Sequence, residues 1–423
     1  MLSTKQKRHS HSGDRCTANT RLCPPRRTIK EFHVTTDDTP LNVYASPNAD
    51  SAPRALYIHV PFCIHRCGYC DFTLVANKDD LIPSYLTAIE RELQQQSDIF
   101  EVDTVFVGGG TPSQLSVEQL KQLFASIKRH FTFAPDAEVT MEANPDGLNQ
   151  NKLHAIADMG VNRLSLGVQS FDQQILTTLE RQHSPEFASD VLSMAVTVFD
   201  NVSLDLIFGV PGQSEQTWEE TLRLATQLPL QHLSTYGLTF EKGTEFFRRQ
   251  QKGDLQSVPE ETERSMYALA MSALKEADFQ HYEISNFARL NRECRHNMVY
   301  WNADEYFAFG PGAARYVNGI RSTNARSVTR WLNSWLSGRP ALQESERLTD
   351  DEKVREAMFL GLRKLGGIGI AEFEQRWQVD PRNVDRPAFA ANTDHGLLEV
   401  DHGFLRLTKE GLFLADSVVS DFL

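Results

Sequence analysis

The chain has 423 residues, 40% of them hydrophobic and 23% charged, which is the composition of an ordinary soluble globular protein. No apolar run reaches the roughly 18 residues that a membrane span needs, so only peripheral membrane contact stays open. The formal net charge is −13, with +7 in residues 1–30 and −20 in the remainder. An acidic body of this kind argues against nucleic acid as the main partner.

Residues 1–53 are predicted to form a disordered basic extension. They are rich in Ser, Thr and Arg and lack the apolar core of a secretory signal. An unstructured tail, a misassigned start codon and an organellar transit peptide are the open explanations. His9 and His11 in this segment are interpreted as tail residues rather than a metal site.

Strand and helix patterns alternate from residue 54 onward. The expected strands span 55–60, 104–107, 138–142, 163–169, 202–208 and 233–239. The expected helices span 81–95, 117–130, 151–159, 185–198, 215–228 and 259–277, with a further helical pattern from residue 172. This alternation indicates βαβ units and a parallel sheet. Six units are too few for a closed eight-stranded barrel, so we predict an α/β fold, an open partial (β/α)6 barrel over residues 54–280. Spacing alone does not separate it from a doubly wound sheet.

The pattern changes after residue 280. Residues 281–345 are expected to extend the barrel with short β-like pieces, the sequence FGPGAARYVNG and a helix over 327–336. Residues 346–423 are expected to form a small C-terminal domain, helical and winged-helix-like. Its predicted elements are helices at 349–365 and 371–377, a loop at 379–392, a hairpin at 397–407 and a last helix from about 408.

Three of the six cysteines fall within eight residues, in the segment HVPFCIHRCGYCDF that follows the first strand. Such clustering in a chain without a secretory signal indicates metal ligation in a reducing compartment, and we expect the cytoplasm. Cys63, Cys67 and Cys70 can ligate three irons of a [4Fe–4S] cluster and leave the fourth iron open. An open iron can chelate S-adenosylmethionine (SAM), and one electron can then cleave its S–C5′ bond to give a 5′-deoxyadenosyl radical. A zinc site completed by His59 or His65 is the alternative.

Polar and glycine residues gather at the predicted carboxyl ends of the strands, where the active sites of parallel barrels lie. Gly108, Gly109, Gly110 and Thr111 end the second strand, Glu142 the third and Gln169 the fourth, while Asp205 lies in the fifth. Buried carboxylates need partners, which a ribose hydroxyl or a sulfonium would supply. Tyr69 is placed to stack on an adenine and Arg181 to pair with a carboxylate. Each residue alone could serve packing or a structural hydrogen bond instead.

The chain resembles the radical SAM proteins related to oxygen-independent coproporphyrinogen III oxidase, and among them the HemW-type haem chaperones. The resemblance runs from about Leu56 to the C-terminus. It rests on the cysteine segment, FVGGGTPSQL, EANPDG, NRLSLGVQSFD, LERQH, DLIFGVPGQ, HNMVYW and FGPGAARY. It implies a partial (β/α)6 barrel with a C-terminal helical domain. It also implies a cluster on the three cysteines, and SAM contacts from Tyr57, Gly109, Gly110, Thr111, Glu142, Gln169, Arg181 and Asp205.

Two positions separate the branches of this family. The oxidases carry a fourth cysteine two residues after the third, where this chain has Phe72, and the chaperones carry the motif HNMVYW found here at residues 296–301. The resemblance therefore implies haem binding at His296 and Tyr300, with Cys294 as a possible second ligand or an inert thiol. From the residues alone, HNMVYW reads as a packed aromatic strand end.

The leading hypothesis is a haem chaperone for respiratory haem proteins, served by an electron donor protein and open to homodimer formation. No catalytic residue is assigned, although the chain would be able in principle to cleave SAM reductively. The alternatives are the oxidative decarboxylation of coproporphyrinogen III and a DNA-binding regulator that uses the winged-helix-like tail.

Overall fold

The computed structural model describes residues 43–47 and 52–423. Most of the predicted basic extension, with His9 and His11, lies outside these residues. Among the described helices, none combines the length and the apolar character that crossing a membrane requires.

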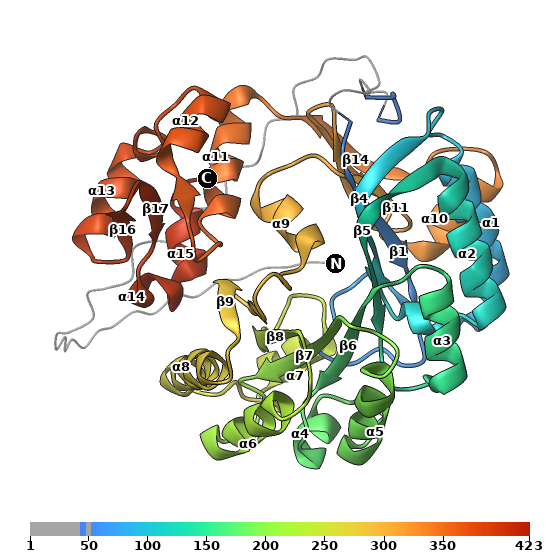
Figure 1. Ribbon diagram of the computed structural model, residues 1–423, viewed down its shortest axis with the longest axis horizontal. Helices are drawn as coiled ribbons and strands as arrows, with labels where there is room; N and C mark the ends of the chain where they lie inside the picture. Colours follow the sequence, from blue (N-terminus) through green and yellow to red (C-terminus); the bar gives the residue numbers. More distant parts are fainter. Residues whose placement is uncertain (1–42, 48–51) are drawn as a thin grey trace, which may run out of the picture. The chain divides into compact units, whose positions relative to one another are not determined.

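A nine-stranded sheet forms the centre of the fold (Figure 1). Neighbouring strands are parallel from β11 to β8, and β10 and β9 then add antiparallel at one edge. In spatial order the strands are β11 (Phe307–Phe309), β1 (Ala55–Val60), β4 (Phe100–Gly109), β5 (Phe131–Ala143), β6 (Arg163–Gln169), β7 (Val202–Phe208), β8 (His232–Gly237), β10 (Asn286–Ala288) and β9 (Gln280–Glu283). The two edge strands do not pair, so the predicted open partial barrel is confirmed, with β11 as a parallel strand that was not expected.

Helices connect the parallel strands and cover the outer face of the sheet (Figure 1). They are α1 (Ile82–Leu93), α2 (Val117–His130), α3 (Gln150–Asp158), α4 (Gln173–Thr178), α5 (Pro185–Ala195), α6 (Glu215–Thr226), α7 (Glu245–Lys252) and α8 (Glu260–Glu276). Local sequence sets their ends. In α2, for example, Ser116 and Gln119 exchange side-chain and backbone hydrogen bonds as a capping box. The main hydrophobic core lies between these helices and outward-facing strand residues such as Leu56, Ile58 and Val107.

The strand register brings polar inward-facing residues to one rim of the barrel. Val60 of β1 is paired with Gly109, Glu142 with Ser165, and Gly167 with Asp205. The carboxyl ends of β1, β4, β5, β6 and β7 therefore lie side by side. Residues that are far apart in sequence thus reach one place because the sheet is parallel.

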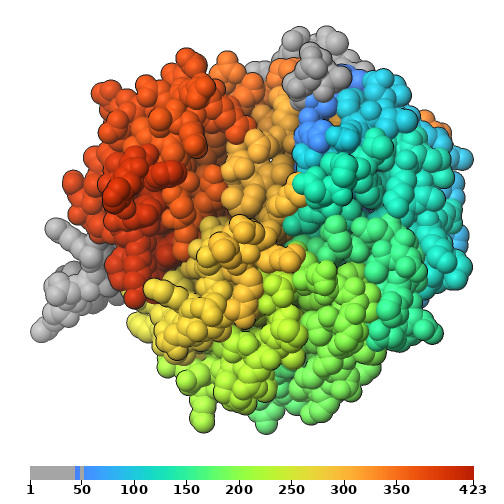
Figure 2. All heavy atoms as spheres, viewed as in Figure 1, coloured from blue at the N-terminus to red at the C-terminus, as the bar shows by residue number. Residues whose placement is uncertain are grey.

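The segment after α8 closes over the barrel. Its elements are β9, β10, α9 (Arg295–Trp301), β11, β12 (Ala314–Val317), β13 (Ile320–Asn324), α10 (Val328–Leu336) and β14 (Leu342–Arg347), of which β12, β13 and β14 form a separate sheet. HNMVYW is therefore not a strand end but a short helix, α9, which contacts both β4 and the C-terminal helix α11. Figure 2 shows this segment at the surface between the C-terminal residues and the barrel.

The C-terminal region has its own hydrophobic core, which includes Met358, Leu405 and Phe422. Its elements are α11 (Asp350–Gly361), β15 (Ile368–Gly369), α12 (Ile370–Trp377), α13 (Arg386–Asp394), β16 (Leu398–Asp401), β17 (Phe404–Leu407), α14 (Lys409–Leu412) and α15 (Ala415–Ser420). The sheet order β15-β17-β16 gives the expected winged-helix-like layout. The predicted loop over 379–392 is wrong, because Asp385 caps α13 by accepting a 3.0 Å hydrogen bond from the Ala388 N–H.

Candidate functional site

A cavity of about 590 Å³ opens at the carboxyl ends of the parallel strands. Most of the residues predicted to bind the cluster or SAM line it together, although they come from six separate segments. They are Cys63, Cys67, Tyr69, Cys70, Gly109, Gly110, Thr111, Glu142, Gln169, Arg181 and Asp205. Ser165, Asn144 and Tyr236 also line the cavity and were not singled out from the sequence.

The cysteine loop is held in shape by backbone hydrogen bonds. Cys63 ends the short strand β2 (Phe62–Cys63), which pairs with β3 (Val75–Ala76), and the Cys70 N–H donates to the Cys67 carbonyl at 3.0 Å. Burial raises the pKa of the Cys63 thiol to about 11, so this thiol stays protonated until a metal displaces the proton. The three thiolates of a cubane bind three different irons and need not converge on one point. The loop thus fits a [4Fe–4S] cluster.

A chain of hydrogen bonds runs from the cysteine loop across the cavity. The Cys63 Sγ lies 3.1 Å from Thr111 Oγ1, which accepts a hydrogen bond from Asn144 Nδ2 at 3.0 Å. Arg181 donates to Asn144 Oδ1 and to the Gly167 carbonyl, each at 2.6 Å. Arg181 is therefore a cavity residue rather than an exposed helix-end arginine. Its Nε is buried and has no hydrogen-bond partner among the described residues.

Two carboxylates face the same cavity without a bonded cation. Glu142 accepts a 2.9 Å hydrogen bond from the Gly109 N–H, and Asp205 accepts one from Ser165 Oγ at 3.3 Å. Burial and the nearby Asp205 raise the pKa of Glu142 to about 7, and burial also raises the pKa of Asp205. A cationic ligand would relieve this electrostatic strain. The ammonium and sulfonium of SAM have the required charge.

Backbone conformation shapes the rim as well. Gln169 has a φ of 73°, where the β6–β7 register shifts, and such left-handed residues are concentrated at functional sites. Gly109 has a φ of 111°, and a Cβ there would lie 2.5 Å from the His59 ring. Gly109 therefore lets strand β4 approach the His59 side chain of β1 closely, in addition to any contact with a ligand.

Glu180 and Phe246 hold the cysteine loop in place from outside, and sequence reasoning missed both residues. Glu180 accepts a 2.8 Å hydrogen bond from the Gly68 N–H, and the Gly68 carbonyl accepts one from the Phe246 N–H at 2.8 Å. Phe246 also packs edge-on against Tyr69 at 6.0 Å between ring centroids. The LERQH segment contains Glu180, but its role depends on α7, a short helix whose only apolar residues are Phe246 and Phe247.

Three of the predicted ligand-binding residues lie elsewhere. Tyr57 and Tyr300 line a neighbouring cavity rather than the one beside the cysteines. His296 is only 1% exposed, with Nδ1 2.9 Å from Thr104 Oγ1 and Nε2 2.9 Å from the Tyr300 hydroxyl. Both ring nitrogens are therefore occupied, and in this packing His296 does not fit the role of an iron ligand.

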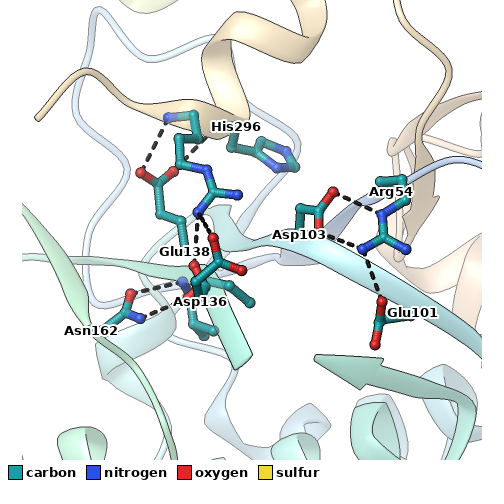
Figure 3. Close-up of polar contacts among 10 residues, drawn as sticks. Arg54, Glu101, Asp103, Asp136, Glu138, Asn162 and His296 are labelled. Carbon is teal, nitrogen blue, oxygen red and sulfur yellow. Dashed lines mark hydrogen bonds and ion pairs between the residues drawn. The ribbon is translucent and has the colours of Figure 1, made fainter. Parts of the chain in front are cut away.

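Glu138 anchors the start of α9 to the barrel (Figure 3). Its carboxylate accepts hydrogen bonds from the backbone N–H groups of Arg295 and His296, both at 3.1 Å. Cys294 is fully buried beside it, and burial raises the pKa of the Cys294 thiol to about 12. This placement favours the inert thiol over an iron ligand, and it shows that the first residues of HNMVYW serve to dock the helix.

Comparison with known families agrees with this geometry. Residues 57–225 match the Radical SAM superfamily, and residues 348–414 match the HemN C-terminal domain. The chain is a radical SAM protein, a class whose cofactors are a [4Fe–4S] cluster and SAM.

The full-length relatives narrow the assignment. The chain is 36% identical over 375 residues to the "Heme chaperone HemW" of Bacillus subtilis, covering 88% of this chain and 99% of the relative. It is 34% identical over 397 residues to the "Radical S-adenosyl methionine domain-containing protein 1, mitochondrial" of Mus musculus, covering 89% of each. The chain therefore belongs to the HemW family. The solved coproporphyrinogen III oxidase (HemN) of Escherichia coli shares the fold, with a TM-score of 0.77, 22% identity and coverage of 88% of this chain and 90% of that one.

Proposed function

We propose that this protein is a haem chaperone that binds haem and delivers it to respiratory haem proteins, with the cluster and SAM assisting or gating the transfer. The observation that carries the proposal is the HNMVYW helix α9, whose Tyr300 lines a cavity next to the cluster cavity in a chain of the HemW family. Relatives from Bacillus, Lactococcus and Synechocystis are named heme chaperones.

The residues of the cavity beside the cysteines are proposed to hold the cofactors. Cys63, Cys67 and Cys70 would bind the cluster, while Glu142 and Asp205 would meet the positive charges of SAM. The remaining proposed SAM contacts are Tyr57, Tyr69, Gly109, Gly110, Thr111, Gln169 and Arg181. When bound, the two cofactors supply one-electron cleavage of SAM. The chain's own part is to bind and orient SAM and to hold its two carboxylates facing the cavity.

Phe72 supports the chaperone over the oxidase. This residue occupies the position of the fourth cysteine of the oxidases, and its side chain is 63% exposed at the mouth of the cavity. An anaerobic assay with SAM, a reductant and coproporphyrinogen III tests the choice. We expect no protoporphyrinogen, and its formation would overturn the chaperone proposal.

Haem binding and its dependence on the cluster are tested by titrating ferric haem into the anaerobically reconstituted protein. We expect wild type to bind haem and pass it to an apo-cytochrome. A variant with Cys63, Cys67 and Cys70 all changed to Ala should retain haem binding but lose transfer. Cys294→Ala is the matched control, because this buried thiol lies away from the loop and should keep both cluster and transfer. Wild type that does not bind haem would refute the proposal.

The cellular setting is proposed from the same family relation. The chaperone would act in the cytoplasm and receive its electron from a donor protein. It would contact the membrane, where respiratory proteins reside, only peripherally. It would assemble at most as a homodimer. Some relatives are named mitochondrial, so recovery of the protein in an organelle fraction would instead favour the transit-peptide interpretation of residues 1–53.

A further inference from the structure

A second cavity, of about 430 Å³, lies next to the cofactor cavity. Five parts of the chain line it: β1, the end of the cysteine loop at residues 71–73, the end of α9 with the turn that follows it, the hairpin β12–β13 with its flanking residues, and β14. Asp71 and Phe72 line both cavities and form the wall between them. Two motifs without an assigned contact, HNMVYW and FGPGAARY, thus meet at one place beside the cluster.

The lining of this second cavity combines aromatic rings and small residues with polar side chains. Tyr57, Phe72, Tyr300 and Tyr306 contribute rings, and the residues Gly312–Ala314 contribute a surface with almost no side chains. Phe72 is the most exposed of the rings, and an exposed aromatic side chain at a cavity mouth is typical of a binding surface. Such a lining suits a planar macrocycle.

The cavity also has a positive group at its edge. Arg326 is exposed, and its guanidinium donates to the Asp71 carbonyl at 2.8 Å and to Thr73 Oγ1 at 3.3 Å. The other charged side chains in the lining are Asp71 and Glu344, and Asp71 Oδ1 lies 3.6 Å from Arg326 Nη2. His59 also lines the cavity, but it is neutral at pH 7 because burial lowers its pKa to about 4. Arg326 is thus the cation that the described lining offers to a carboxylate.

The hairpin is fixed tightly to the cysteine loop. A Cβ at Gly312 would lie 2.4 Å from Thr73 Oγ1, and one at Gly310 would lie 2.5 Å from the His59 carbonyl oxygen. Glu92, fully buried beneath the hairpin, accepts a hydrogen bond from the Gly310 N–H at 2.9 Å. The cavity is therefore preformed, and its position relative to the cluster loop is set by backbone contact.

We propose that this second cavity is the haem site: Phe72 and the tyrosine rings cover the tetrapyrrole, Arg326 pairs with a propionate carboxylate, and Tyr300 rather than His296 is the residue of HNMVYW that touches it. This inference rests on the haem-binding function proposed above, and it adds where in the protein haem binds. His296 acts as a positioning residue, since its Nε2 lies within hydrogen-bond distance of the Tyr300 hydroxyl.

The test is a ferric haem titration of the full-length, cluster-loaded protein, followed by Soret absorbance. Arg326→Gln removes one charge-assisted hydrogen bond and should weaken haem binding about tenfold, and Arg326→Lys should restore part of it. Arg330→Gln, at an exposed position outside both cavities, is the matched control. SAM affinity and iron content are measured in the same samples and should not change, because Arg326 does not line the cofactor cavity.

Phe72→Ala provides an independent arm, because an exposed side chain can be removed without unfolding the protein. It should also weaken haem binding about tenfold, whereas Phe187→Ala, at a 40% exposed phenylalanine on α5, should not. Tyr300→Phe should change the haem absorption spectrum, since it removes the only polar atom of that side chain. If wild type binds haem and Arg326→Gln, Phe72→Ala and Tyr300→Phe all match it, the location is wrong and the chaperone function stands. If wild type binds no haem, the chaperone function itself fails.

Discussion

Replacing Glu142 with glutamine should make the protein more stable at alkaline pH while it weakens SAM binding. Glu142 is half-buried at the rim of the cofactor cavity with a pKa of about 7, raised from 4.5 by desolvation and by Asp205. A carboxyl group whose pKa is raised on folding stabilises the fold fully below its unfolded pKa. That contribution is lost as the pH rises through about 7. Glutamine keeps an oxygen for the Gly109 N–H and carries no charge.

The size of the effect follows from the pKa shift. A rise from 4.5 to about 7 corresponds to about 3 kcal/mol at 1.36 kcal/mol per pKa unit. This is an upper bound, because Glu142 keeps partial contact with the cavity. With an unfolding entropy of about 2.1 cal/mol/K per residue, Glu142→Gln should raise the Tm by up to about 3 °C at pH 8. Near pH 4 it should leave the Tm unchanged.

The assay is thermal unfolding of the cluster-loaded protein without SAM, followed by circular dichroism between pH 4 and pH 8. Isothermal titration calorimetry with SAM in the same buffers tests whether the substitution weakens SAM binding. Part of the pH dependence should remain in the variant, because burial also raises the pKa of Glu92 to about 7. A variant that is less stable than wild type at pH 8, or that keeps the full pH dependence, would refute the reasoning.

Three further substitutions probe other parts of the structure. Gly312→Ala places a Cβ 2.4 Å from Thr73 Oγ1 at a φ of 72°. It should lower stability by about 1–2 kcal/mol from the left-handed backbone alone, and a normal Tm with full iron content would contradict this. Leu405→Ala, in the C-terminal core, should lower the free energy of unfolding measured in urea by about 2–5 kcal/mol. Iron content should stay at the wild-type level, because the cluster lies on the barrel. Arg181→Lys loses the planar fork that reaches Asn144 and should weaken SAM binding about tenfold, which titration calorimetry checks.

The regular part of the fold could be predicted because local signals and tertiary structure agree there. The strands at 55–60, 163–169 and 202–208 and the helix at 117–130 have the predicted bounds. They are apolar runs or strongly amphipathic stretches between clear turn residues. Sequence reasoning missed three helices, α7, α9 and α13, which are short, with seven to nine residues each. α7 buries Phe246 as its main apolar anchor, and the Pro and Asn residues around α13 suggested a loop although Pro387 is tolerated in the first turn.

The candidate site could be predicted by its residue types but not by its division into two cavities. Strand alternation predicts that Tyr57 faces the barrel interior, but it does not show that Asp71 and Phe72 lie between the cavity of Tyr57 and the cavity of the cysteines. His296 and Tyr300 were expected to act together on haem. Their spacing of four residues, once helical, instead directs the histidine at the tyrosine hydroxyl. Burial of His296 depends on Glu138 and Thr104, which are distant in sequence and carry no local signal.

The wall formed by Asp71 and Phe72 has a thermodynamic consequence. A ligand on one side that shifts these two residues changes the affinity for a ligand on the other side. Linkage requires that the change be reciprocal, so with haem at its proposed site, haem would alter SAM affinity by the same factor as SAM would alter haem affinity. A carrier built this way can load and release its cargo according to the supply of a metabolite, without consuming that metabolite in each cycle.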